Sequence, residues 1–109
     1  MCARHDIKIN QGATYTLVFQ IIQADGGPRD LSEYGIRAQL RPRHDSETAQ
    51  DFTATIIDPP RGLCQISLTA EQTEALWPGT AVYDVEIYRD EFVARELEGD
   101  VIISPEVTR

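Results

Sequence analysis

The sequence predicts an all-β protein, folded as one antiparallel β-sandwich of about seven strands with one or two short helical turns. Apolar residues recur mostly with a period of two, which is typical of strands with one buried face. Gly- and Pro-containing turn signals separate these segments at short intervals, and no segment carries a long helical pattern. We therefore expect one sandwich domain over residues 1–109.

Length, composition and charge exclude several classes of protein. The 109 residues have the size of one domain, and an apolar content of 41% is typical of a globular chain. The net charge of −8, with Lys8 as the only lysine, argues against binding nucleic acid through its phosphates. No apolar run is long enough for a membrane helix, and the first residues lack the apolar core of a secretory signal. We expect neither nucleic acid nor membrane as a partner.

Alternation and turn residues define the elements of the first half. We expect strands over 5–10, 13–22 and 35–41, a tight turn at 25–28, and one helical turn over 30–34 capped by Asp30. The polar, unpatterned stretch 42–50 predicts a mobile loop.

The second half continues the same pattern. Strands are expected over 52–56, 64–68, 80–89 and 92–104, with a hairpin loop at 89–91. Thr69 and Gln72 have the spacing of a capping box, and the short helix that they begin must end before Pro78. Gly99, in the middle of the last strand, predicts a bulge with positive φ. That long strand is also expected to form an edge of its sheet.

The inward-facing residues of these strands predict the core. The expected members are Leu17, Phe19, Ile36, Leu40, Phe52, Ile56, Ile66, Leu68, Val85, Ile87, Leu97 and Val101. Cys64 falls within a strand pattern, and a free, packed thiol is favoured there over a disulfide bond with Cys2.

The segment 76–83 looks like the corner between two strands of fibronectin-type sandwiches, where a tyrosine hydroxyl binds upstream backbone. The segment has one residue more than expected between Gly79 and Tyr83, so the tyrosine corner and an ordinary strand tyrosine both remain open. Trp77 is expected to cover one end of the sandwich.

No arrangement of residues predicts catalysis, a cofactor or a metal ion. His5 and His44 are far apart and lack metal-ligand spacing, and the serines lie in no nucleophile elbow. Phosphate-binding and calcium-binding loops are absent as well. We therefore expect a protein that is not an enzyme.

Acidic residues on the last two strands form the candidate partner-docking site. Alternation predicts that these residues project from the outer sheet face: Asp84, Glu86, Glu98, Asp100 and Glu96. One interpretation is a solvated face on which Arg37 and Arg41 of a neighbouring strand pair with the carboxylates. The other is an acidic surface that docks a basic partner.

Four segments together resemble a known group of proteins. They are DLSEYGIRAQLR at 30–41, ISLTAEQTEAL at 66–76, YDVEI at 83–87 and LEGDVIISPEVTR at 97–109. In order and spacing they resemble small tailed-phage and prophage virion structural proteins and, more loosely, the N-terminal immunoglobulin-like domain of phage upper-baseplate proteins. The 42–50 loop departs most from this pattern.

The resemblance implies an immunoglobulin-like sandwich that docks other virion proteins in several symmetric copies. The expected place is the tail, baseplate, fibre-attachment or neck region of the virion, after synthesis in the host cytoplasm. Two alternatives stay open: a capsid-decorating protein, and a module that recognises carbohydrate or a host-surface group through Tyr88, Trp77 or Phe92.

Overall fold

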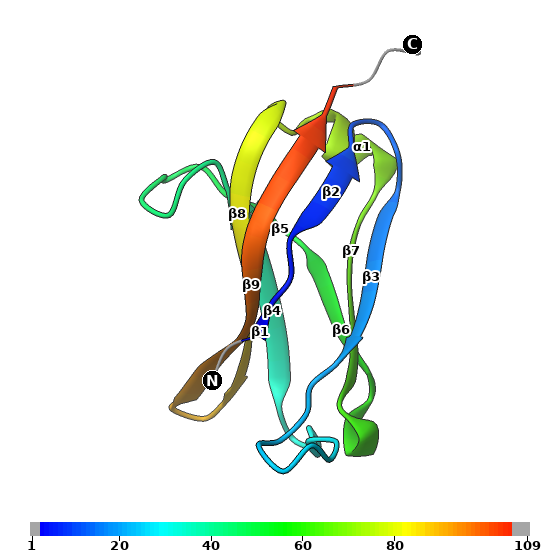
Figure 1. Cartoon of the computed structure of the whole chain (residues 1–109), viewed down its shortest axis with the longest axis vertical. Helices are drawn as coiled ribbons and strands as arrows, with labels where there is room; N and C mark the ends of the chain where they lie inside the picture. Colours follow the sequence, from blue (N-terminus) through cyan, green and yellow to red (C-terminus); the bar gives the residue numbers. More distant parts are fainter. Residues whose placement is uncertain (1–2, 106–109) are drawn as a thin grey trace.

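The computed structural model describes residues 3–105, which form a two-sheet β-sandwich (Figure 1). Sheet A has the strand order β1-β9-β8-β4-β5, with β2 also paired to β9, and sheet B has the order β3-β7-β6. The elements of the described residues are β1 (Ala3–Arg4), β2 (Ile7–Asn10), β3 (Tyr15–Gln20), β4 (Gly35–Arg41), β5 (Gln50–Asp51), β6 (Thr53–Asp58), the 3-10 turn η1 (Pro59–Arg61), β7 (Leu63–Leu68), α1 (Ala70–Glu74), β8 (Gly79–Arg89) and β9 (Phe92–Ser104). The prediction of an all-β sandwich is confirmed.

Two of the expected strands are each divided in two. The segment 50–58 changes sheets at Phe52: β5 pairs with β4 in sheet A, and β6 pairs with β7 in sheet B. The Phe52 amide still donates to the Ala38 carbonyl at 3.0 Å, and its ring is buried between the sheets. Gln50, expected in the loop, therefore belongs to a strand.

The N-terminal segment corrects the expectation that the last strand is an edge. β1 and β2 both pair with β9 in parallel, Ala3 opposite Leu97 and Ile7 opposite Val101, while β8 pairs with the other side of β9. In Figure 1, β9 lies between β8 and the blue N-terminal strands. Apolar Ile7 and Ile9 are buried by this pairing, which explains why the segment folds back onto β9.

The break between β1 and β2 lies directly over Gly99. A Cβ at Gly99 would be 2.7 Å from the carbonyl carbon of His5, so only glycine fits beneath this backbone. Gly99 does not have positive φ, and the irregularity of the strand lies at Glu96 instead. The predicted bulge at Gly99 is therefore wrong, because the glycine is needed for close approach of a second chain segment.

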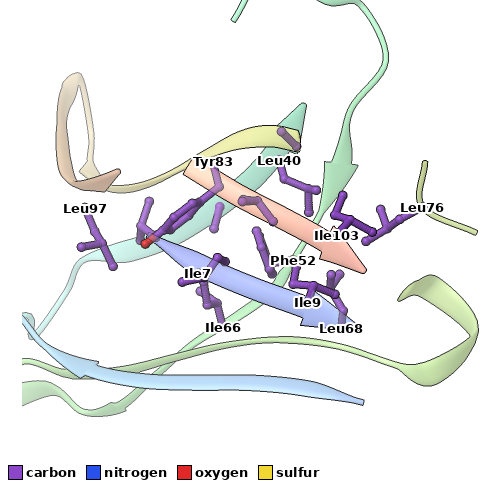
Figure 2. Packing of buried hydrophobic residues seen from close by; sticks show 14 residues of the cluster. Ile7, Ile9, Leu40, Phe52, Ile66, Leu68, Leu76, Tyr83, Leu97 and Ile103 are labelled. Carbon is purple, nitrogen blue, oxygen red and sulfur yellow. The ribbon is translucent and has the colours of Figure 1, made fainter. Parts of the chain in front are cut away.

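The core lies between the two sheets and contains all twelve predicted residues. Figure 2 shows the larger of two clusters, in which Leu40, Phe52, Ile66 and Leu68 pack with Ile7 and Ile9 of the N-terminal segment. Among the predicted residues, four are only half-buried: Leu17, Phe19, Ile36 and Ile56. These four lie on β3, β6 and the part of β4 beyond β5, at the edges of the sheets.

The two predicted helical turns have different outcomes. In α1, Thr69 Oγ1 accepts from Gln72 N at 3.1 Å and Gln72 Oε1 accepts from Thr69 N at 2.9 Å, so the capping box is confirmed. Residues 30–34 form a turn and no helix. Asp30 Oδ1 accepts from Ser32 N, and Glu33 then takes a φ of 69°, which ends any helix within one turn.

Three predicted side-chain environments are also described. Cys64 is a buried free thiol, and Cys2 lies outside the described residues. Trp77 is half-buried against the core beside the end of α1. Tyr83 is no tyrosine corner: its hydroxyl donates to the carbonyl of His5, in the N-terminal segment. No helix of the described chain is long and apolar enough to cross a membrane.

Candidate docking surface

The outer face of sheet A carries Asp84, Glu86 and Glu98, as alternation predicts. Because Val85 and Ile87 point into the core, their neighbours Asp84 and Glu86 point outward from β8. Asp84 lies between Gln39 of β4 and Glu98 of β9 in the pairing register. Three carboxylates are thus gathered over the centre of one sheet face.

Arginines neutralise much of this charge. Arg95 Nε lies 3.3 Å from Asp84 Oδ2, and its Nη1 lies 3.3 Å from Glu98 Oε1. Arg37 Nε lies 2.8 Å from Glu86 Oε1, directly across the β4–β8 ladder. The ion-paired interpretation of this face is correct for these three carboxylates.

Asp84 is the most strongly perturbed of these acids. Burial raises the pKa of Asp84 above 3.8, and the nearby Glu86 and Glu98 raise it further, while Arg95 and Arg41 act in the opposite direction. Since burial is the largest cause, the ionised form of this carboxyl is destabilised in the folded chain.

Glu96 corrects the prediction, because it does not share this face. The β8–β9 register shifts so that Val85 pairs with Leu97 while Glu86 pairs with Arg95, which leaves Glu96 as the extra residue of a bulge. Its side chain is 14% exposed and lies 3.7 Å from Arg29 of the loop before β4. Arg95 occupies the outward position that simple alternation assigns to Glu96.

Arg95 is therefore the residue of this face that the sequence interpretation missed. A signal for it exists in the hairpin, where the two-residue turn at Asp90 and Glu91 sets Ile87 opposite Ala94. Counting outward from this turn places Arg95 outside, whereas counting from buried Leu97 places Glu96 outside. The conflict between the two counts locates the bulge.

Asp100 lies farther along the same face, in a separate charge cluster. Arg4 Nη2 is 3.0 Å from Asp100 Oδ2 and 3.2 Å from Asp6 Oδ1. Asp6 Oδ1 also accepts from the Asp100 backbone amide at 2.9 Å, where the break between β1 and β2 interrupts the ladder. This cluster fastens the N-terminal segment to β9 and remains well exposed.

The start of the 42–50 loop divides the surface into two hollows. One, of about 420 Å³, is bordered by Asp84, Glu98 and His44. The other, of about 410 Å³, is bordered by Pro42, Asp100 and the exposed Ile102. Arg41 Nη1 donates to the Ser46 carbonyl within this loop, so it does not pair with the acidic residues as expected. The mobility of the loop stays a prediction.

A third hollow, of about 620 Å³, opens between β4 and β6. Ile36, Ala38, Phe52 and Ala54 form its apolar lining, while Asp84 and Glu86 lie on its border with the sheet face. The acidic residues therefore separate a polar hollow from a partly apolar one. Such an arrangement suits a protein surface with charged and apolar parts.

The aromatic residues proposed for recognition are not gathered in one place. Tyr88 is 38% exposed on the outer face of sheet A, where the Arg37 guanidinium lies 5.1 Å from its ring centre. Phe92 is 47% exposed and meets Tyr34 edge to face at 6.1 Å. Trp77 belongs to the opposite part of the chain and is half-buried.

Within residues 3–105, no group of three or more His, Cys, Asp and Glu side chains is arranged to hold a metal ion. His5 lies at the break over Gly99, and His44 lies at the edge of a hollow, far apart in the fold. The geometry of this face therefore favours contact with a macromolecule.

Comparison with known proteins finds likeness of fold only. Neither a protein-family model nor a curated protein sequence matches the chain. Among solved structures, the chain is similar to the N-terminal domain of phage TP901-1 ORF48, with a TM-score of 0.61 and 11% identity over 92% of this chain and 85% of that one. It is also similar to part of Listeria monocytogenes InlP, with a TM-score of 0.51 and 16% identity over 92% of this chain and 26% of that one. The sandwich is thus a fold that other proteins share, one of them from a phage.

Proposed function

We propose that this chain is a non-enzymatic structural protein of a phage virion, a docking module of the tail, baseplate, fibre-attachment or neck region. The observation that carries the proposal is the likeness of nearly the whole chain to a phage domain, which agrees with the resemblance of its closing segment. Its partners would be other virion proteins, arranged in several symmetric copies and assembled after synthesis in the host cytoplasm. A small sandwich whose described residues hold no metal cluster suits a docking role.

The proposed docking surface is the outer face of sheet A, defined by Asp84, Glu86, Glu98 and Asp100. Each carboxylate is paired with an arginine at the surface, and exposed pairs of this kind contribute at most about 1 kcal/mol. A basic partner can therefore exchange these contacts for its own at little expense. The hollows beside Asp84 would accept side chains of the partner, and the 42–50 loop is the second candidate contact.

Charge reversal at Glu98 tests this surface. A phage lacking the gene is complemented with wild-type protein or with Glu98→Lys, and the purified particles are assayed for the protein by quantitative mass spectrometry. We expect the variant to be depleted from particles, more strongly in low salt, because salt screens exposed charges. Glu74→Lys in α1 makes the same charge change away from this face and serves as the matched control.

Two outcomes contradict the proposal at different levels. Full occupancy of Glu98→Lys in particles would mean that the acidic face is only a solvated surface. Absence of the wild-type protein from purified particles would overturn the virion role itself. Cryo-electron microscopy of the same particles then distinguishes a tail or neck position from capsid decoration.

The exposed aromatic rings favour a second candidate, a module that recognises carbohydrate or a host-surface group. Tyr88 and Phe92 lie near one end of the β8–β9 hairpin, each beside an arginine. Aromatic faces of this kind stack on sugar rings. A glycan array with the isolated protein tests this role: specific binding that Tyr88→Ala abolishes would support it, and an empty array would dismiss it.

A further inference from the structure

Strand β3 is an unpaired edge of sheet B with an unusual composition. Among residues 3–105, β7 is the only strand that pairs with β3, and Figure 1 shows β3 at the outer side of the sandwich. Its six residues, Tyr15–Gln20, include no charged residue, proline or glycine. Natural edge strands normally carry such residues, because they prevent pairing with another chain.

The other exposed edges of the described sandwich are protected in this way. The edge formed by β1 and β2 carries Arg4 and Lys8, and the edge at β5 carries Asp51. The β6 edge ends in Asp58, with a register shift between Ile56 and Asp58. Only β3 presents a regular strand without a protecting charge or irregularity.

The outer face of sheet B is uncharged as well. Its outward residues are Thr16, Val18, Gln20, Thr53, Thr55, Ile57, Leu63, Gln65 and Ser67. The whole chain carries a net charge of −8, so this region is where two copies repel each other least.

The backbone of β3 is prepared to accept another strand. Ile21 N donates to Gly62 O at 2.8 Å, and antiparallel ladders alternate from one residue to the next. The alternation that starts at Ile21 therefore directs the N–H and C=O groups of Thr16, Val18 and Gln20 away from β7. These three residues also have exposed side chains on the outer face.

We propose that the β3 edge is a homodimer interface, at which β3 pairs antiparallel with β3 of a second copy about a two-fold axis through Val18. In this register Val18 faces its own counterpart, and Thr16 faces Gln20 of the other copy. Both are hydrogen-bonding pairs, because each of these residues directs its backbone groups outward. The two three-stranded sheets become one six-stranded sheet.

The same register satisfies the side chains. Leu17 of one copy lies opposite Phe19 of the other on the core side, where both are only half-buried in one copy. Val18, which is 54% exposed, is covered by Val18 of the second copy. Apolar pairs directly opposite each other stabilise antiparallel strands, and no like charges face each other in this register. The inference stands apart from the proposed docking face, which belongs to the other sheet.

Sedimentation equilibrium of the purified chain tests the dimer. The concentration series should extend to about 1 mM, where a complex with a Kd of about 1 mM is half-formed. Val18→Lys places two like charges opposite each other and should raise the dimer Kd at least about tenfold. Ile102→Lys, a change at a residue of similar exposure on the outer face of sheet A, should leave the Kd unchanged.

Disulfide trapping tests the register independently. In a Cys2→Ser background, Val18→Cys brings two thiols together at a Cα separation of about 5.5 Å, which permits a disulfide. Thr16→Cys separates its two thiols by four residues along the strand, about 14 Å, which does not. We expect oxidation to trap dimers of the first variant alone.

Each result decides the inference. A chain that stays monomeric across the series, or equal trapping of both cysteine variants, would overturn it. Dimers that Ile102→Lys disrupts and Val18→Lys does not would place the interface on the other sheet and overturn it too. The particle-incorporation result for Glu98→Lys is independent of all these outcomes, so the two proposals fail separately.

Discussion

The Tyr83 hydroxyl donates a hydrogen bond of 2.5 Å to the carbonyl oxygen of His5, across 78 residues of sequence. Tyr83 lies opposite Gly99 in the β8–β9 ladder, and the backbone of His5 crosses directly over that glycine. Figure 2 shows the Tyr83 oxygen at the end of the ring beside Ile7. The tyrosine thus satisfies a carbonyl at the break between β1 and β2, while the His5 amide donates to Glu98 O at 2.9 Å.

Tyr83→Phe tests this relationship. The variant keeps the buried ring and removes only the hydroxyl, leaving the His5 carbonyl without this donor. We expect a loss of about 1–2 kcal/mol in the free energy of unfolding, measured by urea denaturation. Tyr88→Phe removes a hydroxyl from an exposed ring and should change stability by less than about 0.5 kcal/mol. Equal effects of the two variants would argue against a specific role of the His5 contact.

Gly99→Ala should destabilise the fold by about 1–3 kcal/mol, because the added Cβ would force the His5 backbone away from β9. The direction is informative, since alanine normally stabilises a strand relative to glycine. Thermal unfolding followed by circular dichroism gives the sign. A variant as stable as the wild type would mean that no close approach exists at this position.

Asp84→Asn should stabilise the protein at pH 7. Burial raises the pKa of Asp84 in the folded chain above the ordinary 3.8, so between these two values the folded state binds more protons than the unfolded state. The corresponding stability is present below pH 3.8 and is lost as the pH rises through the folded-state pKa. Asparagine removes the ionised form, with a gain of no more than about 1 kcal/mol because the side chain is partly exposed.

Urea denaturation at several pH values measures this effect. The difference between Asp84→Asn and wild type should shrink as the pH falls toward about 4. Asp45→Asn makes the same chemical change in the exposed loop and is the matched control. A loss of stability at pH 7 for Asp84→Asn would mean that the ion pair with Arg95 outweighs the burial of the carboxylate.

Cys64 should resist thiol reagents until the protein unfolds. The side chain is fully buried, and burial raises its pKa to about 11, so about one thiol in a thousand is ionised at pH 8. In a Cys2→Ser variant, the rate of labelling should be very slow in buffer and rise steeply through the urea transition. Fast labelling in buffer would show that the β6–β7 region opens readily.

Local residue chemistry was enough to predict the elements and most of the core. Alternation of apolar side chains gives the strands over 35–41 and 80–89 directly, because each strand buries one face whatever its neighbours are. The Thr69–Gln72 capping box is equally local, since both partners lie within one helical turn. The three acidic residues at the centre of the docking face follow from the same alternation.

The tertiary structure alone decided which strands are neighbours, and with them the edges and the candidate site. The parallel pairing of β1 and β2 with β9 joins segments more than ninety residues apart and removes the edge that the last strand was expected to form. The bulge at Glu96 exchanges Glu96 for Arg95 on the outer face, because two registers, one from the hairpin turn and one from the core, must both be satisfied. Gly99 has its role for the same reason: the segment that requires its missing side chain comes from the other end of the chain.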